Sequence, residues 1–249
     1  MSPLAVLFDL DGVISDTASV HAKAWKAVFD DVLTTDGRRY ALFAEPEDYL
    51  RYLDGKTRLA GIEDFLRSRA IDLPLGVANA TGIDSIHGIG NTKNAVFRNL
   101  LTTNGVTIFA DALRLIEMLQ TVGADIGLAS SSKNARLVLE KAGLTGCFKS
   151  ILDGLVAEEN GVASKPHPDF YRHAASLLGR SPKQCVVIED AISGVVSAKQ
   201  AGTGLVIGIA RHGDGQSLRA NGADMVVSSL DELDFGRSEL FLRDTEGFT

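Results

Sequence analysis

The sequence is poor in the residues that crosslink a protein, and it has no long apolar run. Only two cysteines, six prolines and one tryptophan occur among its 249 residues. Cys147 and Cys185 are far apart and form no C-x-x-C pair, which favours reduced thiols over a disulfide framework or a zinc site. The best apolar stretch, residues 204–210, is too short to span a membrane. No basic segment precedes an apolar one near the first residue, so we expect no signal peptide and a cytoplasmic location.

Positive charge is also scarce. The chain has 25 Lys and Arg against 32 Asp and Glu, a net charge of −7, which makes it a poor general binder of nucleic acid or of an anionic membrane. The hydrophobic fraction of 45% and the charged fraction of 23% are ordinary for a globular protein and exclude a disordered chain, a collagen and a coiled coil. The length predicts one large domain or two smaller ones.

Short apolar segments alternate with helical patterns over much of the chain. Continuously apolar runs are typical of strands buried on both faces, and they occur at 4–8, 124–129, 185–188, 204–209 and, more weakly, 225–227. Helical patterns separate them, at 112–122, 133–142, 169–178 and 191–201. This alternation predicts the α/β class with a doubly wound parallel sheet.

The region after the first strand is different, because it contains no convincing buried strand. It has helical patterns at 20–32, 46–53, 59–69 and 91–101, with a Gly- and Asn-containing loop at 76–90. We therefore predict a core of residues 1–16 and 106–235, a helical domain of residues 17–105 inserted into it, and a peripheral tail of residues 236–249.

Two carboxylates directly follow the first predicted strand. Asp9 and Asp11 stand at i and i+2, so in an extended chain they point the same way, at the strand end where open α/β sheets bind ligands. Such like charges repel unless a cation or a shared proton relieves them. A nucleophile that forms an acyl-phosphate beside a general acid/base would fit this pair. A solvated acidic pair is one alternative. A calcium loop is the other, although its glycine would stand sixth, whereas Gly12 stands fourth.

Three further segments carry polar groups at predicted strand ends or turns. Ser130–Ser132 follow the second strand, where hydroxyls and backbone N–H groups would bind an anion or simply cap the next helix. Lys165 lies between turn residues and is either a partner for acidic groups or a surface lysine. Glu189 and Asp190 end another buried strand, and acids at the ends of two strands of one sheet fit a Mg²⁺ site.

In this order, the four segments resemble the haloacid dehalogenase-like phosphotransferase superfamily over nearly the whole chain. The resemblance to its β-phosphoglucomutase-like branch is carried by Asp9-x-Asp11-Gly12-x-x-x-Asp16-Thr17, by His21 and Trp25, and by Ala129-Ser130-x-Ser132-Lys133-Asn134. It implies a Rossmann-like doubly wound core with an inserted helical cap domain. It also implies Mg²⁺-dependent phosphoryl transfer.

The resemblance further implies a role for each core motif. Asp9 is expected to be the nucleophile that becomes phosphorylated, and Asp11 the general acid/base. Ser130 would bind phosphate, and Lys165 would offset the charge of the aspartyl-phosphate. The implied magnesium ligands are Asp9, the backbone carbonyl of Asp11, Glu189 and Asp190.

Two activities remain open within the resemblance. A mutase would interconvert β-glucose 1-phosphate and glucose 6-phosphate through a bisphosphate, whereas a sugar-phosphate phosphatase would use water in place of the second sugar hydroxyl. Arg58 matches the cap residue that holds the second phosphate, a role that suits a bidentate guanidinium; for it and the other cap residues, solvated helix surface is the alternative. The implied substrate-binding residues are Thr17, His21, Trp25, Gly55, Arg58, Lys93, Asn94, Ser131, Ser132, Lys133 and Asn134, with Thr17 and His21 matching linker residues that couple cap closure to catalysis.

Two departures from the branch concern substrate selection. The segment 72–90 is longer than expected of a compact cap, and Asp54 replaces an expected basic residue. They leave the identity of the sugar open. A non-catalytic protein of this fold is the remaining hypothesis, which the intact set of core motifs opposes. The expected partner is a small phosphorylated sugar, not nucleic acid or a membrane. The oligomeric state stays open, a monomer being one option.

Overall fold

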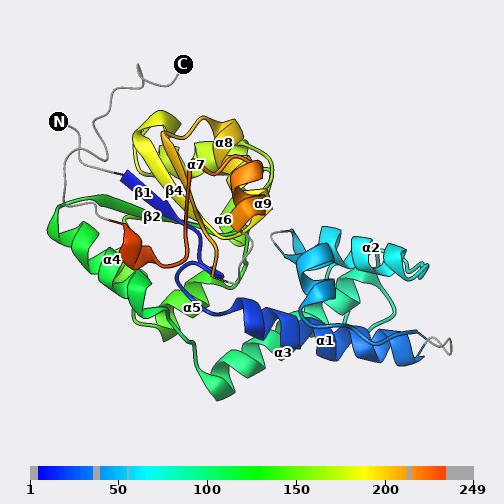
Figure 1. The fold of residues 1–249 in the computed structure, drawn as a ribbon. Helices are drawn as coiled ribbons and strands as arrows, with labels where there is room; N and C mark the ends of the chain where they lie inside the picture. The colour runs from blue at the N-terminus through cyan, green and yellow to red at the C-terminus, as the bar shows by residue number, and fades with distance from the viewer. Residues whose placement is uncertain (1–4, 36–39, 55, 212–214, 234–249) are drawn as a thin grey trace. The chain divides into compact units, whose positions relative to one another are not determined.

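The chain forms two compact units in a computed structural model that describes residues 5–35, 40–54, 56–211 and 215–233 (Figure 1). The first unit, here called the core, comprises Met1–Ser15 and Ile108–Thr249, and the second, here called the cap, comprises Asp16–Thr107. The boundaries proposed from the sequence stay predictions, and the predicted tail 236–249 lies outside the described residues.

The core is built on a six-stranded parallel sheet, which confirms the predicted α/β class. Its strands are β1 (Ala5–Phe8), β2 (Asp125–Ala129), β3 (Ser150–Leu152), β4 (Cys185–Glu189), β5 (Leu205–Ile209) and β6 (Met225–Val227), in the order β3-β2-β1-β4-β5-β6. Phe8 of β1 pairs with Leu128 of β2 and with Ile188 of β4, so the carboxyl ends of these three strands are level. The sequence did not predict β3, which is three residues long and only partly buried.

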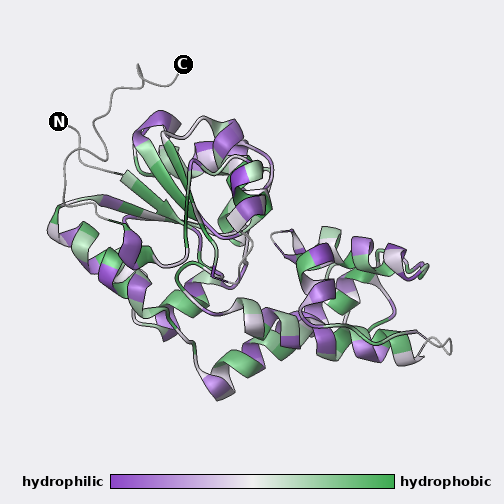
Figure 2. Ribbon diagram, viewed as in Figure 1, coloured by the Kyte–Doolittle hydropathy of each residue, from purple (hydrophilic) through white to green (hydrophobic). Residues whose placement is uncertain are grey.

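Helices pack on both faces of this sheet, and that explains its apolar strands. In Figure 1, α4 lies on one face, and α7 and α8 lie on the other. Ala5 and Leu7 contact the α7–α8 side, where Phe170 and Val195 complete the cluster. Accordingly, the strands in Figure 2 are mainly hydrophobic while the helices alternate. The core helices are α4 (Ala110–Thr121), α5 (Ala135–Lys141), α6 (Gly154–Glu159), α7 (Asp169–Leu177), α8 (Ile192–Ala201) and α9 (Gly215–Ala220), with short 3₁₀ turns η2 (Thr145–Cys147), η3 (Pro182–Gln184) and η4 (Leu230–Glu232).

The cap is helical and has its own aromatic core. It comprises α1 (Ala18–Thr35), the π-helical turn η1 (Tyr49–Leu53), α2 (Arg58–Ser68) and α3 (Ile86–Asn104). The rings of Phe29 and Phe65 lie 4.0 Å apart at their centroids. The last helix begins five residues before the predicted start at 91, because the Ser85 hydroxyl accepts a hydrogen bond from the Gly88 amide and caps it. Asn91 fastens the preceding loop by donating to the carbonyls of Ala78 and Ala80.

The insertion begins and ends at neighbouring residues of the core. Ser15 forms an antiparallel bridge with Ile108, and the Phe109 amide donates to the Ile14 carbonyl at 2.9 Å. Within the cap, the Asp16 amide donates to the Thr107 carbonyl at 2.9 Å. The first and last residues of the insertion are therefore hydrogen-bonded to each other, and so are the core residues that flank it.

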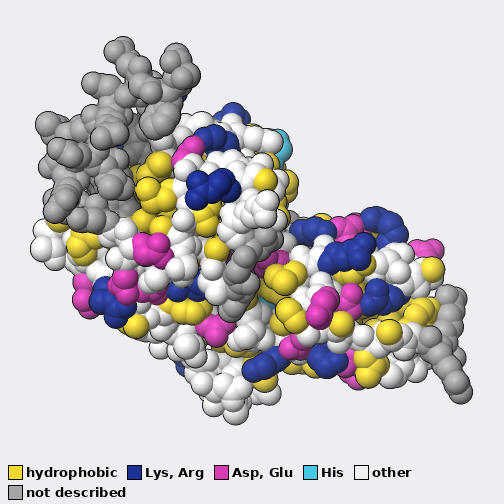
Figure 3. Space-filling model, viewed as in Figure 1, with side chains coloured by type: hydrophobic (Ala, Val, Ile, Leu, Met, Phe, Trp, Pro, Cys, Tyr) yellow, Lys and Arg dark blue, Asp and Glu magenta, His cyan; other side chains and the backbone are white. Residues whose placement is uncertain are grey.

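The surface and the helices agree with the mixed composition of the chain. On the face drawn in Figure 3, basic and acidic side chains are interspersed over the described residues. Among these residues, no helix has the combined length and apolar character that a membrane span requires.

Candidate active site

Asp9 lies at the carboxyl end of the central part of the sheet. The strand before it, β1, is completely buried, since it is paired on both edges and covered on both faces. The Asp9 amide extends the pairing by donating to the Ile188 carbonyl at 3.0 Å. Its side chain is 10% exposed. The fold therefore places this carboxylate at a fixed, almost desolvated position.

Lys165 joins Asp9 to the ends of two other strands. Its ammonium donates to Asp9 Oδ1 at 2.6 Å and to the Ala129 carbonyl at 2.8 Å, and it lies 2.6 Å from Glu189 Oε1. These three contacts match the three N–H donors of an ammonium group. Asp9, Ala129 and Glu189 belong to the ends of β1, β2 and β4, so one side chain links all three. The side chain of Lys165 is 3% exposed.

The electrostatics of this buried pair are governed by desolvation and by neighbouring acids. Burial raises the pKa of Asp9 well above its ordinary value; Lys165 opposes the rise, and Glu189 and Asp11 add to it. Burial alone would lower the pKa of Lys165, but its charge interactions and hydrogen bonds with Asp9 and Glu189 raise it. Lys165 is therefore a permanent cation here. Any additional positive charge close to Asp9 would stabilise the ionised form of its carboxyl group.

Glu189 is held in place by more than Lys165. Tyr171 of α7 is fully buried and donates its hydroxyl to Glu189 Oε1 at 2.5 Å. On the other side, a methyl group on Gly194 would overlap the Glu189 carboxylate, so α8 can approach only because that residue is glycine. Sequence reasoning missed Tyr171, because it lies within the predicted helix 169–178 and belongs to no motif.

Asp9, Glu189 and Asp190 form an acidic group that is suited to a metal ion. One carboxylate oxygen from each lies within 4.8 Å of the others. With Lys165 as the neighbouring cation, three carboxylates leave two negative charges uncompensated, and a divalent cation would neutralise both. Hard cations prefer such oxygen ligands. The donor set therefore fits a divalent metal ion at the predicted strand ends, whereas the identity of that ion as Mg²⁺ stays a prediction.

In the serine-rich loop after β2, serine hydroxyl groups accept hydrogen bonds from backbone amides of the same segment. Ser130 is 1% exposed, and its hydroxyl accepts the Ser132 amide at 3.2 Å. The Ser132 hydroxyl accepts the Asn134 amide at 3.2 Å. Ser131 has a buried hydroxyl oxygen with no hydrogen-bond partner in the described part of the chain. Lys133, in contrast, is 40% exposed and pairs with Glu158 at 2.6 Å.

In the cap, four of the predicted residues form two hydrogen-bonded pairs, Lys93 with His21 and Arg58 with Asn94. Lys93 is 4% exposed, its ammonium lies 2.5 Å from His21 Nδ1, and it sits 4.8 Å from the centre of the Trp25 ring. Burial, with Lys93 and Arg58 nearby, holds the pKa of His21 well below its ordinary value, so this imidazole is neutral and its Nδ1 atom can accept a hydrogen bond from Lys93. Arg58, at the start of α2, donates to the Asn94 side chain at 3.0 Å.

Three other predicted cap positions have different outcomes. Thr17 is fully buried immediately before α1, and its carbonyl accepts the His21 amide at 2.8 Å. Trp25 is 5% exposed and stacks on Phe29 in the cap core. Gly55 lies outside the described residues. Contact of these residues with a substrate stays a prediction.

Comparison with known proteins identifies the class to which this site belongs. Residues 3–202 match the haloacid dehalogenase-like hydrolase family. The β-phosphoglucomutase of Mycobacterium bovis is 41% identical over 92% of this chain and 90% of its own length. Hexitol phosphatase A of Escherichia coli is 29% identical over 91% of each chain. The crystal structure of β-phosphoglucomutase from Clostridium difficile superposes with a TM-score of 0.76 at 26% identity, over 94% of this chain and 95% of that one.

The chain belongs to the haloacid dehalogenase-like hydrolase family, in its β-phosphoglucomutase-like branch. The resemblance stated from the sequence motifs is thereby confirmed, as is the predicted parallel-sheet core with an inserted helical region. Proteins of this kind are phosphomutases or phosphatases, so the non-catalytic hypothesis loses its support.

Proposed function

We propose that the protein is a Mg²⁺-dependent β-phosphoglucomutase that interconverts β-glucose 1-phosphate and glucose 6-phosphate through a phosphorylated Asp9. The observation that carries this proposal is the contact of Asp9 with Lys165 at 2.6 Å, inside a group of three carboxylates at the strand ends. The 41% identity to a β-phosphoglucomutase, against 29% to a hexitol phosphatase, supports the mutase over the phosphatase.

In the first half-reaction, a carboxylate oxygen of Asp9 attacks one phosphorus of the sugar bisphosphate. The new oxygen–phosphorus bond forms as the bond from that phosphorus to the sugar oxygen breaks, Asp11 gives a proton to the departing oxygen, and a sugar monophosphate leaves. In the second half, Asp11 takes a proton from the free hydroxyl of a sugar monophosphate, whose oxygen attacks the phosphorus, frees Asp9 and forms the bisphosphate again. Lys165 offsets the charge of the aspartyl-phosphate, and the loop amides and hydroxyls at Ser130–Ser132 bind its oxygens.

The metal would be held by Asp9, by Asp190 and by the backbone carbonyl of Asp11. Glu189 is a weaker candidate ligand than the sequence implied, because its Oε1 atom already contacts both Lys165 and Tyr171. When bound, a magnesium ion would neutralise the charge that develops on the phosphoryl oxygens.

The cap residues are proposed to bind the rest of the substrate. Arg58, oriented by its hydrogen bond to Asn94, would bind the second phosphate of the bisphosphate, with Ser132, Lys133 and Asn134 as further ligands. For Lys133, this requires exchanging its exposed pair with Glu158 for the phosphate. Since sugar phosphates are charged and do not cross membranes unaided, the cytoplasm is the compartment that we propose.

A sugar-phosphate phosphatase is the second candidate, favoured by the match to a hydrolase family and by the relation to hexitol phosphatase A. Its first half-reaction is the same, and water replaces the sugar hydroxyl in the second. The two activities differ only in the final acceptor of the phosphoryl group.

One assay separates them. Purified protein is incubated with Mg²⁺, β-glucose 1-phosphate and a trace of β-glucose 1,6-bisphosphate, and glucose 6-phosphate and inorganic phosphate are followed separately. A mutase forms glucose 6-phosphate in large excess over phosphate, and Asp9→Asn forms neither. Stoichiometric release of phosphate would instead establish the phosphatase, and turnover by Asp9→Asn would remove Asp9 from the mechanism.

A further inference from the structure

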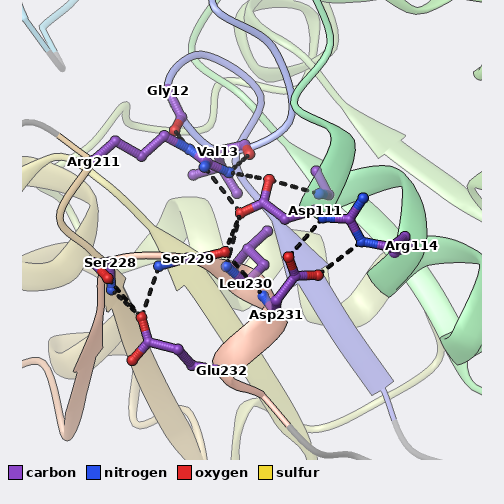
Figure 4. Close-up of polar contacts among 11 residues, drawn as sticks. Gly12, Val13, Asp111, Arg114, Arg211, Ser228, Ser229, Leu230, Asp231 and Glu232 are labelled. Atoms are coloured by element: carbon purple, nitrogen blue, oxygen red, sulfur yellow. Dashed lines mark hydrogen bonds and ion pairs between the residues drawn. The ribbon is translucent and has the colours of Figure 1, made fainter.

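Arg211, which follows β5, binds the loop that carries Asp11. Its Nε atom donates to the Gly12 carbonyl at 2.9 Å, and its Nη2 atom donates to the Val13 carbonyl at 2.9 Å (Figure 4). Gly12 and Val13 are the two residues immediately after Asp11. The sequence analysis gave Arg211 no role, because nothing in its local sequence indicates a contact with residues 199 and 198 positions away.

The orientation of the Arg211 side chain is fixed by further contacts with Asp111 and Phe109. Its Nη1 and Nη2 atoms each donate to one Asp111 oxygen at 3.0 Å. Asp111 also accepts the Leu230 amide at 2.8 Å and the Ser229 hydroxyl at 3.0 Å, so it is itself fixed. The ring of Phe109 lies 3.7 Å from the guanidinium carbon. A planar, bidentate guanidinium between these groups has little freedom left.

The hydrogen bonds within the loop do not hold all of its peptide groups, which is why contacts from Arg211 matter. The amides of Ile14 and Ser15 both donate to the Leu10 carbonyl at 2.9 Å, and the Gly12 amide donates to the Ser15 carbonyl at 2.8 Å. These bonds do not use the carbonyls of Gly12 and Val13. Gly12 has a φ of +81° and, as glycine, the widest choice of other conformations. By binding both carbonyls, Arg211 fixes the two peptide planes that follow Asp11.

We infer that Arg211 is a positioning residue for Asp11: together with Asp111 it holds the loop after Asp9 in the conformation that aims the Asp11 side chain at the sugar oxygen. This inference rests on the proposed function, because that function makes Asp11 the general acid/base. Lysine cannot replace Arg211, since a single ammonium does not present a planar fork to two carbonyls and a carboxylate at once.

The test compares Arg211→Lys, Arg211→Ala and Asp111→Asn with a matched control, Arg114→Ala. Arg114 of α4 forms a bidentate pair with Asp231 of η4, at 2.9 and 2.6 Å, so it shares the element that carries Asp111, but it donates to Asp231 and not to the loop. Figure 4 shows both pairs. The readouts are kcat and KM for glucose 6-phosphate formation, and hydrogen exchange of the Gly12, Ile14 and Ser15 amides against that of Val6 and Leu7 in β1.

We expect Arg211→Lys to lower kcat by about 10²-fold, the usual effect of a catalytic group displaced by about 1 Å, with KM nearly unchanged. The three loop amides should exchange faster while the β1 amides do not, and Asp111→Asn should follow in the same direction. Arg114→Ala should resemble the wild type in both readouts. Should Arg211→Ala fail to fold, Arg211→Lys and Asp111→Asn carry the test.

Two results would overturn the inference. One is a wild-type kcat in both Arg211→Lys and Asp111→Asn, and the other is faster exchange in β1 and the loop alike, which would mean general destabilisation only. Failure of the proposed function looks different, because the wild type itself would then form no glucose 6-phosphate. In that case, the exchange comparison and the hydrolysis of acetyl phosphate still report on the loop.

Discussion

Lys165 is the residue at which the core motifs meet. Its three contacts reach Asp9, the Ala129 carbonyl and Glu189, so each donor serves a different strand end. Removing one partner of such a buried pair leaves the other charge uncompensated. The nucleophile, the serine loop and the acidic end of β4 are consequently coupled through one side chain, and substitutions at any of them should be read with the others in mind.

Substitutions of Asp190 and of Asp11, two acidic residues that neighbour Asp9, are expected to have different effects. Asp190→Ala removes an oxygen ligand, so it should raise the Mg²⁺ concentration that half-maximal activity requires. Asp11→Asn should leave that requirement nearly unchanged, because a backbone carbonyl is the proposed ligand there. It should nevertheless slow phosphoryl transfer by about 10²-fold or more, as expected when a general acid/base is lost. Magnesium titrations of both variants measure the difference, and equal weakening of metal binding would contradict it.

Tyr171→Phe isolates the hydroxyl that the sequence did not reveal. The substitution keeps the ring in α7 but removes a donor from the buried Glu189 carboxylate, and a hydrogen bond to a charged group contributes about 1.5–3 kcal/mol. We expect a loss of that size in the free energy of unfolding, measured in urea, together with lower activity. Unchanged stability would mean that Lys165 and the Ala191 amide suffice to stabilise the buried Glu189 carboxylate.

At the level of single residues, the sequence predicts chemistry better than contacts. Asp9, Asp11 and Asp190 could be proposed because they follow apolar runs directly, and strand ends of one parallel sheet meet at one edge. Without the resemblance, the partnership of Asp9 with Lys165 was no more than one of two alternatives for that lysine, since 156 positions separate them. Tyr171 and Arg211 act through such long-range contacts and carry no motif of their own.

Among the elements, the turn after β1 is where the backbone conformation matters most. Gly12 has a positive φ, and a methyl group there would lie 2.6 Å from Asp190 Cγ and closer still to Oδ2. The turn and the end of β4 can therefore come together only around glycine.

Gly12→Ala should for this reason weaken Mg²⁺ binding and activity strongly. The matched control is Gly202→Ala at the end of α8, where φ is +78° and no atom lies within 4 Å of the added methyl. The control should lose about 1 kcal/mol of stability, the usual strain of a left-handed non-glycine residue, with normal Mg²⁺ dependence. Isothermal titration with Mg²⁺ and urea unfolding compare the two. If both variants bind the metal as the wild type does, crowding at Asp190 is not important.

Element prediction was clearest where burial was complete, although the partly buried β6, which is apolar throughout, was also predicted. All residues of β1 and β4 are buried, so their continuous apolar runs identified them. Strand β3 has two half-buried residues out of three and begins with a serine, and no periodicity distinguishes so short a segment from a loop. The start of α3 was missed because its first five residues include Gly88 and Gly90, which lower helix propensity, whereas Ser85 caps it in the folded chain.

For the whole molecule, Arg58 separates the two candidate activities. If the protein is a mutase, Arg58→Ala should reduce isomerisation severely, by about the 2–5 kcal/mol seen when one member of a buried charged pair is removed. Hydrolysis of acetyl phosphate should fall much less, since that substrate has no second phosphate. An equal fall in both activities, or intact isomerisation, would favour the phosphatase with a differently lined cap.

The stability of the whole molecule should also depend on pH through Asp111. Burial alone would raise the pKa of Asp111, but hydrogen bonds from Arg211, Leu230 and Ser229 hold it below its ordinary value. A carboxyl with a lowered folded-state pKa stabilises the protein above its unfolded-state pKa, about 3.9, and loses that contribution as the pH falls through the folded value. Urea unfolding should show that Asp111→Asn is less stable than the wild type at pH 7. The difference should shrink steadily below about pH 4; a difference that is constant with pH would show that the Asp111 charge does not matter.

The adjacent ends of the inserted unit have an evolutionary consequence. Because Ser15 bridges Ile108 on the core side and Asp16 bonds Thr107 on the other, the core backbone closes on itself whatever lies between these residues. Insertions are tolerated where their two ends are close together. One module can therefore be exchanged for another of different length or lining without shifting Asp9 or Lys165. Chimaeras that transplant this unit between relatives should keep the chemistry of the host and acquire the preferences of the donor.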